Sequence, residues 1–167
     1  MTHLSMDPLT LTHTAITLIA IVSGLLALSQ MLDSVYCGGV TGVFLAMSVL
    51  TSVTGFVFFH PEHPPTPAQV TGVVALIVLV PTLYALYLAH LRGFWRPVYV
   101  IGAVISLWFN LFVLVTQSFD KVPSLCATMP ACPAPGGPVF GAVQGIVLLA
   151  TVIAGWLAVK RFRPIGA

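Results

Sequence analysis

The sequence predicts an all-α integral membrane protein: one bundle of five transmembrane helices, with the amino terminus outside and the carboxyl terminus inside. Of the 167 residues, 58% are hydrophobic and 6% are charged, whereas a soluble domain has roughly 25% charged residues. The mean hydropathy is +1.05. Five windows contain no Asp, Glu, Lys or Arg and have the length of a spanning helix, about 20 residues. Runs of this length cross a bilayer as helices, because the backbone must satisfy its own hydrogen bonds there.

The five windows occupy nearly the whole chain, which we therefore interpret as one membrane domain over residues 1–167. Prolines, glycines and charges separate them, since prolines remove backbone donors and end helices. The expected helices cover residues 11–32, 38–59, 68–90, 97–117 and 138–159. The first break holds Asp33, the second is a proline-rich run at 60–67, and the third holds two arginines at 92–97. The last connection, 118–137, is the longest and contains four prolines.

The basic residues predict the orientation, because Lys and Arg are retained on the cytoplasmic side of short loops. Arg92 and Arg96 lie between the third and fourth windows, and a basic cluster at 160–163 follows the fifth. An odd number of spans brings these two groups to one side of the membrane. Lys121 alone falls on the other side. The carboxyl terminus is therefore expected inside.

Two of the three cysteines lie in the long outer loop. Cys126 and Cys132 are disulfide candidates if this loop faces an oxidising compartment. A zinc site is the weaker interpretation, because two thiols do not complete a structural ligand set. Cys37 lies near the inner end of the second helix.

Uncharged polar residues from several helices are expected at similar depth in the outer half of the bilayer. A rise of about 1.5 Å per residue places four of them there: Thr54, Asn110, Gln117 and Gln144. One hypothesis is an outward-opening pocket that binds a small ligand or a quinone headgroup. The other is a set of interhelical hydrogen bonds that stabilise the bundle.

Small residues at four-residue spacing predict where helices approach each other, because they allow close backbone contact. Two candidate contact faces are Gly38–Gly42–Ala46 and Gly141–Gly145. In the fourth helix, Gly102, Ser106, Asn110 and Gln117 share one stripe, which we expect to face protein or water.

Histidines near the outer ends of the first two helices suggest a metal or haem site. His60, Glu62 and His63 form a short run, and His13 can approach from the first helix. Imidazoles with a carboxylate bind zinc or copper, and two imidazoles can ligate haem. The run lacks the i, i+4 helical spacing of a metalloprotease motif. Solvated interfacial histidines without a metal are the alternative.

The sequence contains no nucleophile–base constellation and no phosphate-binding loop, so we expect no catalytic residues. Its uncharged spans argue against a proton-coupled carrier, and a net charge of +2 without a basic patch argues against nucleic acid. Our leading hypothesis is an accessory or structural subunit of a membrane complex, or a binder of a small apolar ligand in the outer leaflet. The alternative is an outer-side haem- or metal-binding redox protein, and the third hypothesis is a small-solute transporter. Expected partners are the bilayer and other membrane subunits or further copies of the chain.

Two stretches resemble a family of small bacterial multi-pass membrane proteins of unassigned function. The first runs from the Trp-Arg-Pro-Val-Tyr segment at 95–99 through the Asn-Leu-Phe-Val-Leu-Val segment at 110–115 to Lys-Val-Pro at 121–123. The second is Leu-Thr-Ser-Val-Thr-Gly-Phe at 50–56. The resemblance implies a proteobacterial inner-membrane protein. It implies no activity, substrate or catalytic residue.

Overall fold

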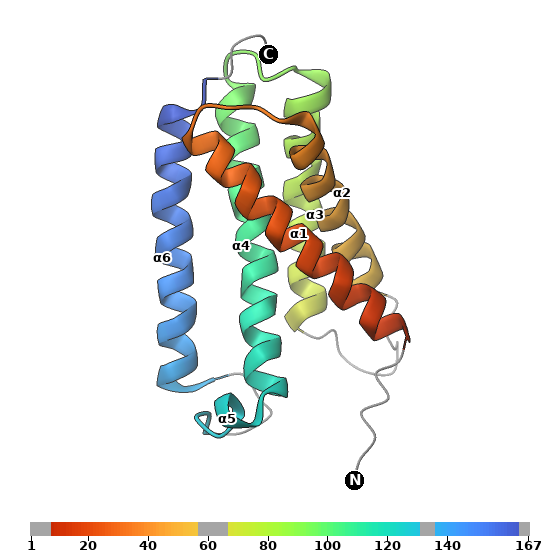
Figure 1. Ribbon diagram of the computed structural model, residues 1–167, viewed down its shortest axis with the longest axis vertical. Helices are drawn as coiled ribbons and strands as arrows, with labels where there is room; N and C mark the ends of the chain where they lie inside the picture. The colour runs from red at the N-terminus through yellow and green to blue at the C-terminus, as the bar shows by residue number, and fades with distance from the viewer. Residues whose placement is uncertain (1–7, 57–66, 131–135, 164–167) are drawn as a thin grey trace.

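The computed structural model describes residues 8–56, 67–130 and 136–163, and the regular secondary structure in these ranges is helical (Figure 1). The elements are α1 (Pro8–Leu32), α2 (Gly38–Gly55), α3 (Pro67–Leu83), a π-helical turn (Tyr84–Leu88), α4 (Trp95–Lys121), α5 (Pro123–Cys126) and α6 (Gly137–Arg161). Five helical segments in the described part are long and apolar enough to cross a membrane: α1, α2, α3 with its π-helical turn, α4 and α6. The prediction of an all-helical protein with five helices long and apolar enough to span a membrane is confirmed for the described residues.

The fourth span is longer than the sequence window that predicted it. It begins at Trp95 and ends at Lys121, where the window covered residues 97–117. The window stopped at charged residues, whereas a helix continues through charges at the membrane interface, where side chains reach water. Asp120 and Lys121 therefore belong to the last turn of α4.

The third span changes its helical geometry beyond Pro81. This proline lies inside α3 and has no N–H to donate to the carbonyl one turn earlier. The helix continues as the π-helical turn Tyr84–Leu88, after which the N–H of Ala89 donates to the carbonyl of Tyr84 at 2.9 Å. Such wide turns relieve local strain in an α-helix and change its direction.

The helices are arranged so that the two ends of the bundle differ. Figure 1 shows α1 crossing obliquely in front of α4, with α6 beside α4 and with α2 and α3 on the opposite side. The starts of α1 and α3, the ends of α2 and α4, and α5 all lie at one end, which we call the amino-terminal end. The α3–α4 connection and the end of α6 lie at the other end.

The apolar core lies towards the end opposite the amino-terminal end. Its fully buried members come from every spanning element and include Ala27, Phe44, Leu45, Leu79, Tyr99, Leu107, Ala158 and Phe162. A smaller apolar cluster of Phe119, Cys126 and Met129 packs under α5. At the amino-terminal end, the space among α1, α2, α3 and α4 is lined by polar and apolar residues.

The outer surface of the bundle is apolar. Ile146 and Leu149 on α6 are 68% and 61% exposed, and Ile77 and Val80 on α3 are 65% and 68% exposed. A soluble protein avoids contiguous apolar surface of this kind, whereas lipid tails solvate it. These faces fit a bundle surrounded by lipid.

Among the described residues, the closest helix contacts at glycines lie at Gly102, Gly24 and Gly155, and not on the predicted faces Gly38–Gly42–Ala46 and Gly141–Gly145. A Cβ atom added to Gly141 or Gly145 would meet no atom within 4 Å, so the predicted contact face of α6 is wrong within this chain. At Gly24 an added Cβ would lie 2.7 Å from Phe44, and at Gly155 it would lie 2.9 Å from Val104. On the other predicted face, Gly38 would meet only Tyr36, and Gly42 would have the Tyr87 hydroxyl 3.7 Å away. Glycine spacing alone does not indicate which side of a helix faces a neighbour.

Candidate ligand-binding cavity

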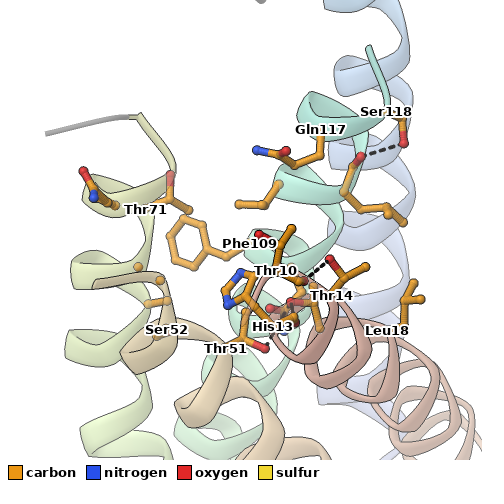
Figure 2. Close-up of a pocket in the computed structure, with 18 of the residues that line it drawn as sticks. Thr10, His13, Thr14, Leu18, Thr51, Ser52, Thr71, Phe109, Gln117 and Ser118 are labelled. Carbon is orange, nitrogen blue, oxygen red and sulfur yellow. Dashed lines mark hydrogen bonds between the residues drawn. The ribbon is translucent and has the colours of Figure 1, made fainter. Parts of the chain in front are cut away.

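A cavity of about 550 Å³ opens at the amino-terminal end of the bundle, among α1, α2, α3 and α4. It is partly open to the surroundings and lies within the size range of small-molecule sites, about 300–1,000 Å³. Figure 2 shows side chains from all four helices around one space, with Thr71 and Ser52 on one side and Gln117 on another.

The first helix contributes a polar face to this cavity. Its polar lining residues are Thr10, His13, Thr14 and Thr17. Offsets of three and four bring these positions onto one side of a helix. The hydroxyls of Thr14 and Thr17 donate to carbonyl oxygens of α1 itself, at 2.8 and 2.9 Å. This local bonding lowers the cost of holding hydroxyls within the bilayer.

The orientation of His13 follows from its bond to α2. The Nδ1 atom of His13 lies 2.7 Å from the hydroxyl oxygen of Thr54. Thr54 uses its one hydroxyl proton to bond the carbonyl of Leu50 at 2.7 Å, so the Thr54 oxygen accepts and Nδ1 of His13 donates. Thr54 therefore stands behind the imidazole and holds its ring, and does not itself line the cavity.

The fourth helix supplies the deepest and the outermost polar groups. Asn110 is 7% exposed, and its Nδ2 atom donates to the Ser48 hydroxyl of α2 at 3.1 Å. Gln117, Ser118 and Lys121 line the same cavity in the last turns of α4. The structure thus brings together Asn110 and Gln117, two of the residues that we predicted to share a pocket.

Apolar side chains and small residues complete the lining. Phe109, Val113 and Leu114 on α4 and Leu18 on α1 line the cavity. The small lining residues Gly55, Gly72 and Ala75 come from α2 and α3. A Cβ atom added to Gly72 would lie 3.6 Å from the nearest atom, the Ser52 carbonyl oxygen, and would therefore fit without overlap. The absence of large side chains at these positions leaves the cavity its volume.

Gln144, like Thr54, is a predicted pocket residue that does not line the cavity. Its Nε2 atom donates to the Phe112 carbonyl at 3.1 Å and to the Thr116 hydroxyl at 3.4 Å, across the α4–α6 contact. Gln144 therefore helps to join two helices, as in the alternative that we weighed for the whole polar set. Its depth matches that of the cavity, but it lies on a different side of α4.

Several cavity residues escaped the sequence analysis: Thr10, Thr14, Thr51, Ser52, Gln69 and Thr71. Hydroxyl side chains are common in membrane helices, so a single one of them does not indicate a binding site. The three threonines of α1 at offsets of four and three, which share one side of the helix, could have indicated this cavity face.

The predicted metal or haem site stays a prediction. His60, Glu62 and His63 lie outside the described residues. In residues 8–56, 67–130 and 136–163, no group of three or more His, Cys, Asp or Glu side chains is placed to hold a metal ion.

The outer-loop cysteines are described in part. Cys126 is buried in the cluster under α5 and is disulfide-bonded. Cys132, its predicted partner, lies outside the described residues. Cys37, before α2, is a free thiol.

Comparisons with known protein families, curated proteins and solved structures find no match to this chain.

Proposed function

We propose that this membrane protein binds one small, largely apolar molecule with a polar group in the cavity at its amino-terminal end. The observation that carries this proposal is the cavity itself: about 550 Å³, lined by side chains of four spanning helices, with polar groups next to an apolar wall. The wall on α4 suits an apolar body, and the amides and hydroxyls suit a polar group.

Physical chemistry favours an occupant over a purely structural role. Polar residues within a membrane bundle are costly and normally bond to one another. Gln144 does so at the α4–α6 contact. In contrast, Gln117 lines the cavity, and its side chain makes no hydrogen bond within the described part of the chain. An amide left open beside a cavity is available to a ligand.

The binding experiment uses the purified full-length chain in phosphatidylcholine nanodiscs. The probes are two radiolabelled single-chain amphiphiles, dodecanol and dodecanoate. We expect at least one of them to bind saturably, with one molecule per protein. Empty nanodiscs measure partition into lipid and are subtracted. Uptake of both probes that only follows the lipid content, without saturation, would contradict the proposal.

We further propose that the cavity faces the outside of a bacterial inner membrane, with the carboxyl terminus in the cytoplasm. Arg92 and Arg96 near the start of α4 lie at the same end of the bundle as Lys160 and Arg161 at the end of α6 (Figure 1). Lys121 lies at the cavity end. This distribution of basic residues supports the orientation, since Lys and Arg are retained on the cytoplasmic side.

Reporter fusions test this orientation. A reporter that is active only in the cytoplasm should be active when fused after Phe94. A reporter that is active only outside should be active when fused after Met129. The reverse pattern at both positions would place the cavity on the cytoplasmic side.

A further inference from the structure

One face of α4 forms a polar ladder from the floor of the cavity to its mouth. Asn110, Gln117 and Lys121 all line the cavity, at offsets of seven and four that keep them on one side of the helix. At about 1.5 Å per residue, the ladder is roughly 16 Å long. Asn110 is 7% exposed, and Lys121 is exposed. A ligand bound along this face therefore has one buried end and one end near water.

The charge at the mouth is positive. Lys121 lines the cavity, whereas the described lining residues include no Asp or Glu. Within the described part of the chain, Lys121 makes no ion pair. The neighbouring Asp120 does not line the cavity, and its Oδ1 atom is buried.

The helix ends do not reverse this sign. Of the four helices that line the cavity, α1 and α3 have their positive starts at this end, and α2 and α4 have their negative ends here. Each end carries about half an elementary charge, so these contributions offset one another. Among the described residues that line the cavity, Lys121 carries the one formal charge, and it is positive.

Hydrogen-bond donors at the mouth suit an anion. Gln117 and Lys121 lie four residues apart on the same face of α4, and neither side chain makes a hydrogen bond within the described ranges. The nearby Ser118 hydroxyl already donates to the Leu114 carbonyl at 2.8 Å. An ammonium beside a free amide can make a charge-assisted, two-donor contact with a carboxylate or phosphate.

We propose that the ligand is an anionic amphiphile whose charged group binds Lys121 and Gln117 while its hydrocarbon lies against Phe109, Val113 and Leu114. This inference rests on the proposed function and adds the chemical class of the ligand. The anionic group belongs either to a free acid or to the headgroup of a membrane lipid.

The test compares two probes of equal chain length, dodecanoate and dodecanol, on the full-length chain in phosphatidylcholine nanodiscs. The buffer is alkaline enough to ionise the acid. We expect dodecanoate to bind at least tenfold tighter than dodecanol, which is about 1.4 kcal/mol. In Lys121→Gln, dodecanoate should lose this preference over dodecanol.

The matched control is Lys160→Gln. Lys160 lies over the ring of Trp156 at 3.7 Å, at the opposite end of the bundle. This variant removes the same charge from the protein and should keep the wild-type preference for dodecanoate.

The outcomes separate this inference from the proposed function. Equal, saturable binding of both probes, unchanged in Lys121→Gln, would overturn the anionic ligand and leave the binding site standing. Failure of both probes to bind would overturn the proposed function as well.

A second arm of the experiment distinguishes the two sources of the anion. Phosphatidylglycerol replaces half of the lipid in the nanodiscs. Weaker dodecanoate binding in the wild-type chain, with no such loss in Lys121→Gln, identifies a lipid headgroup as the competitor. Unchanged binding in the wild-type chain supports a free acid. The first arm tests the anion site at Lys121, and this arm tests only the source of the anion.

Discussion

Replacing Gly102 with alanine is expected to destabilise the bundle more than any other single methyl addition to its glycines. A Cβ atom at Gly102 would overlap the hydroxyl of Thr82, on the facing side of α3. Thr82 is fully buried, and its hydroxyl donates to the Val78 carbonyl at 2.7 Å, so it cannot rotate away without losing that bond. Overpacking of this kind costs about 1–3 kcal/mol. Unfolding of the purified protein in SDS-containing mixed micelles measures the loss.

Two further variants show whether the helix contact is the cause. Gly145→Ala adds the same methyl group where no atom lies within 4 Å, so it should match or exceed wild-type stability because alanine favours a helix. Adding Thr82→Ala to Gly102→Ala should recover most of the stability that Gly102→Ala loses, because the double variant lacks the overlapping hydroxyl. The two residues are in contact, so a double-mutant cycle should show that their effects are coupled. Equal stability of Gly102→Ala and Gly145→Ala would refute the close α3–α4 contact.

Replacing Gly72 with phenylalanine should abolish binding in the cavity. Gly72 lines the cavity, and a Cβ atom there has ordinary contact distances, 3.6 Å or more, to its neighbours. The ring then enters the space that the ligand needs, because the cavity is the open volume beside this residue. The dissociation constant of the better-binding probe, dodecanol or dodecanoate, should rise at least tenfold, as measured by equilibrium binding in nanodiscs.

The matched control is Gly145→Phe. It adds the same ring to α6 at a position with no atom within 4 Å of the added Cβ, on a helix that does not line the cavity. Binding should stay at the wild-type level, and both variants should elute as single species of wild-type size. Wild-type affinity in a well-folded Gly72→Phe would mean that the probe binds outside this cavity.

The number and placement of the helices could be predicted from the sequence because lipid leaves the backbone few options. Each window without charges became a helix, since hydrogen bonds inside a bilayer must be made within the segment. The end of α4 was missed because charge marks the membrane interface and not the end of the helix. Lys121, which belongs to that last turn, therefore was not recognised as a cavity residue.

For the candidate site, the sequence predicted the depth of each polar residue in the bundle but not the neighbouring helix that its side chain faces. Asn110 and Gln144 share a level, since residue counting gives the height along each helix. Which neighbour a side chain faces depends on the rotation of the helix, and α6 turns Gln144 towards Phe112. Asn110 was the more secure prediction because Gly102 and Ser106 mark the same stripe of α4 as protein-facing, and both are buried in the structure.

The unknown rotation of each helix also explains why the glycine contacts could not all be predicted. Gly102 contacts a neighbouring helix closely, whereas Gly141 and Gly145 face open space. All of these residues follow four-residue patterns that favour contact. Packing of the remaining side chains, which the sequence does not reveal directly, decides which pattern is used.

Photocrosslinking tests the central claim, that a small amphiphile occupies the cavity, most directly. Dodecanoate carrying a diazirine on its hydrocarbon is bound to the full-length chain in nanodiscs, irradiated and mapped by peptide mass spectrometry. We predict crosslinks concentrated on α4 at residues 109–117 and on the facing side of α1, which an excess of unlabelled dodecanoate removes. Crosslinks spread over lipid-facing residues such as Ile146 and Leu149, unaffected by that excess, would contradict the account.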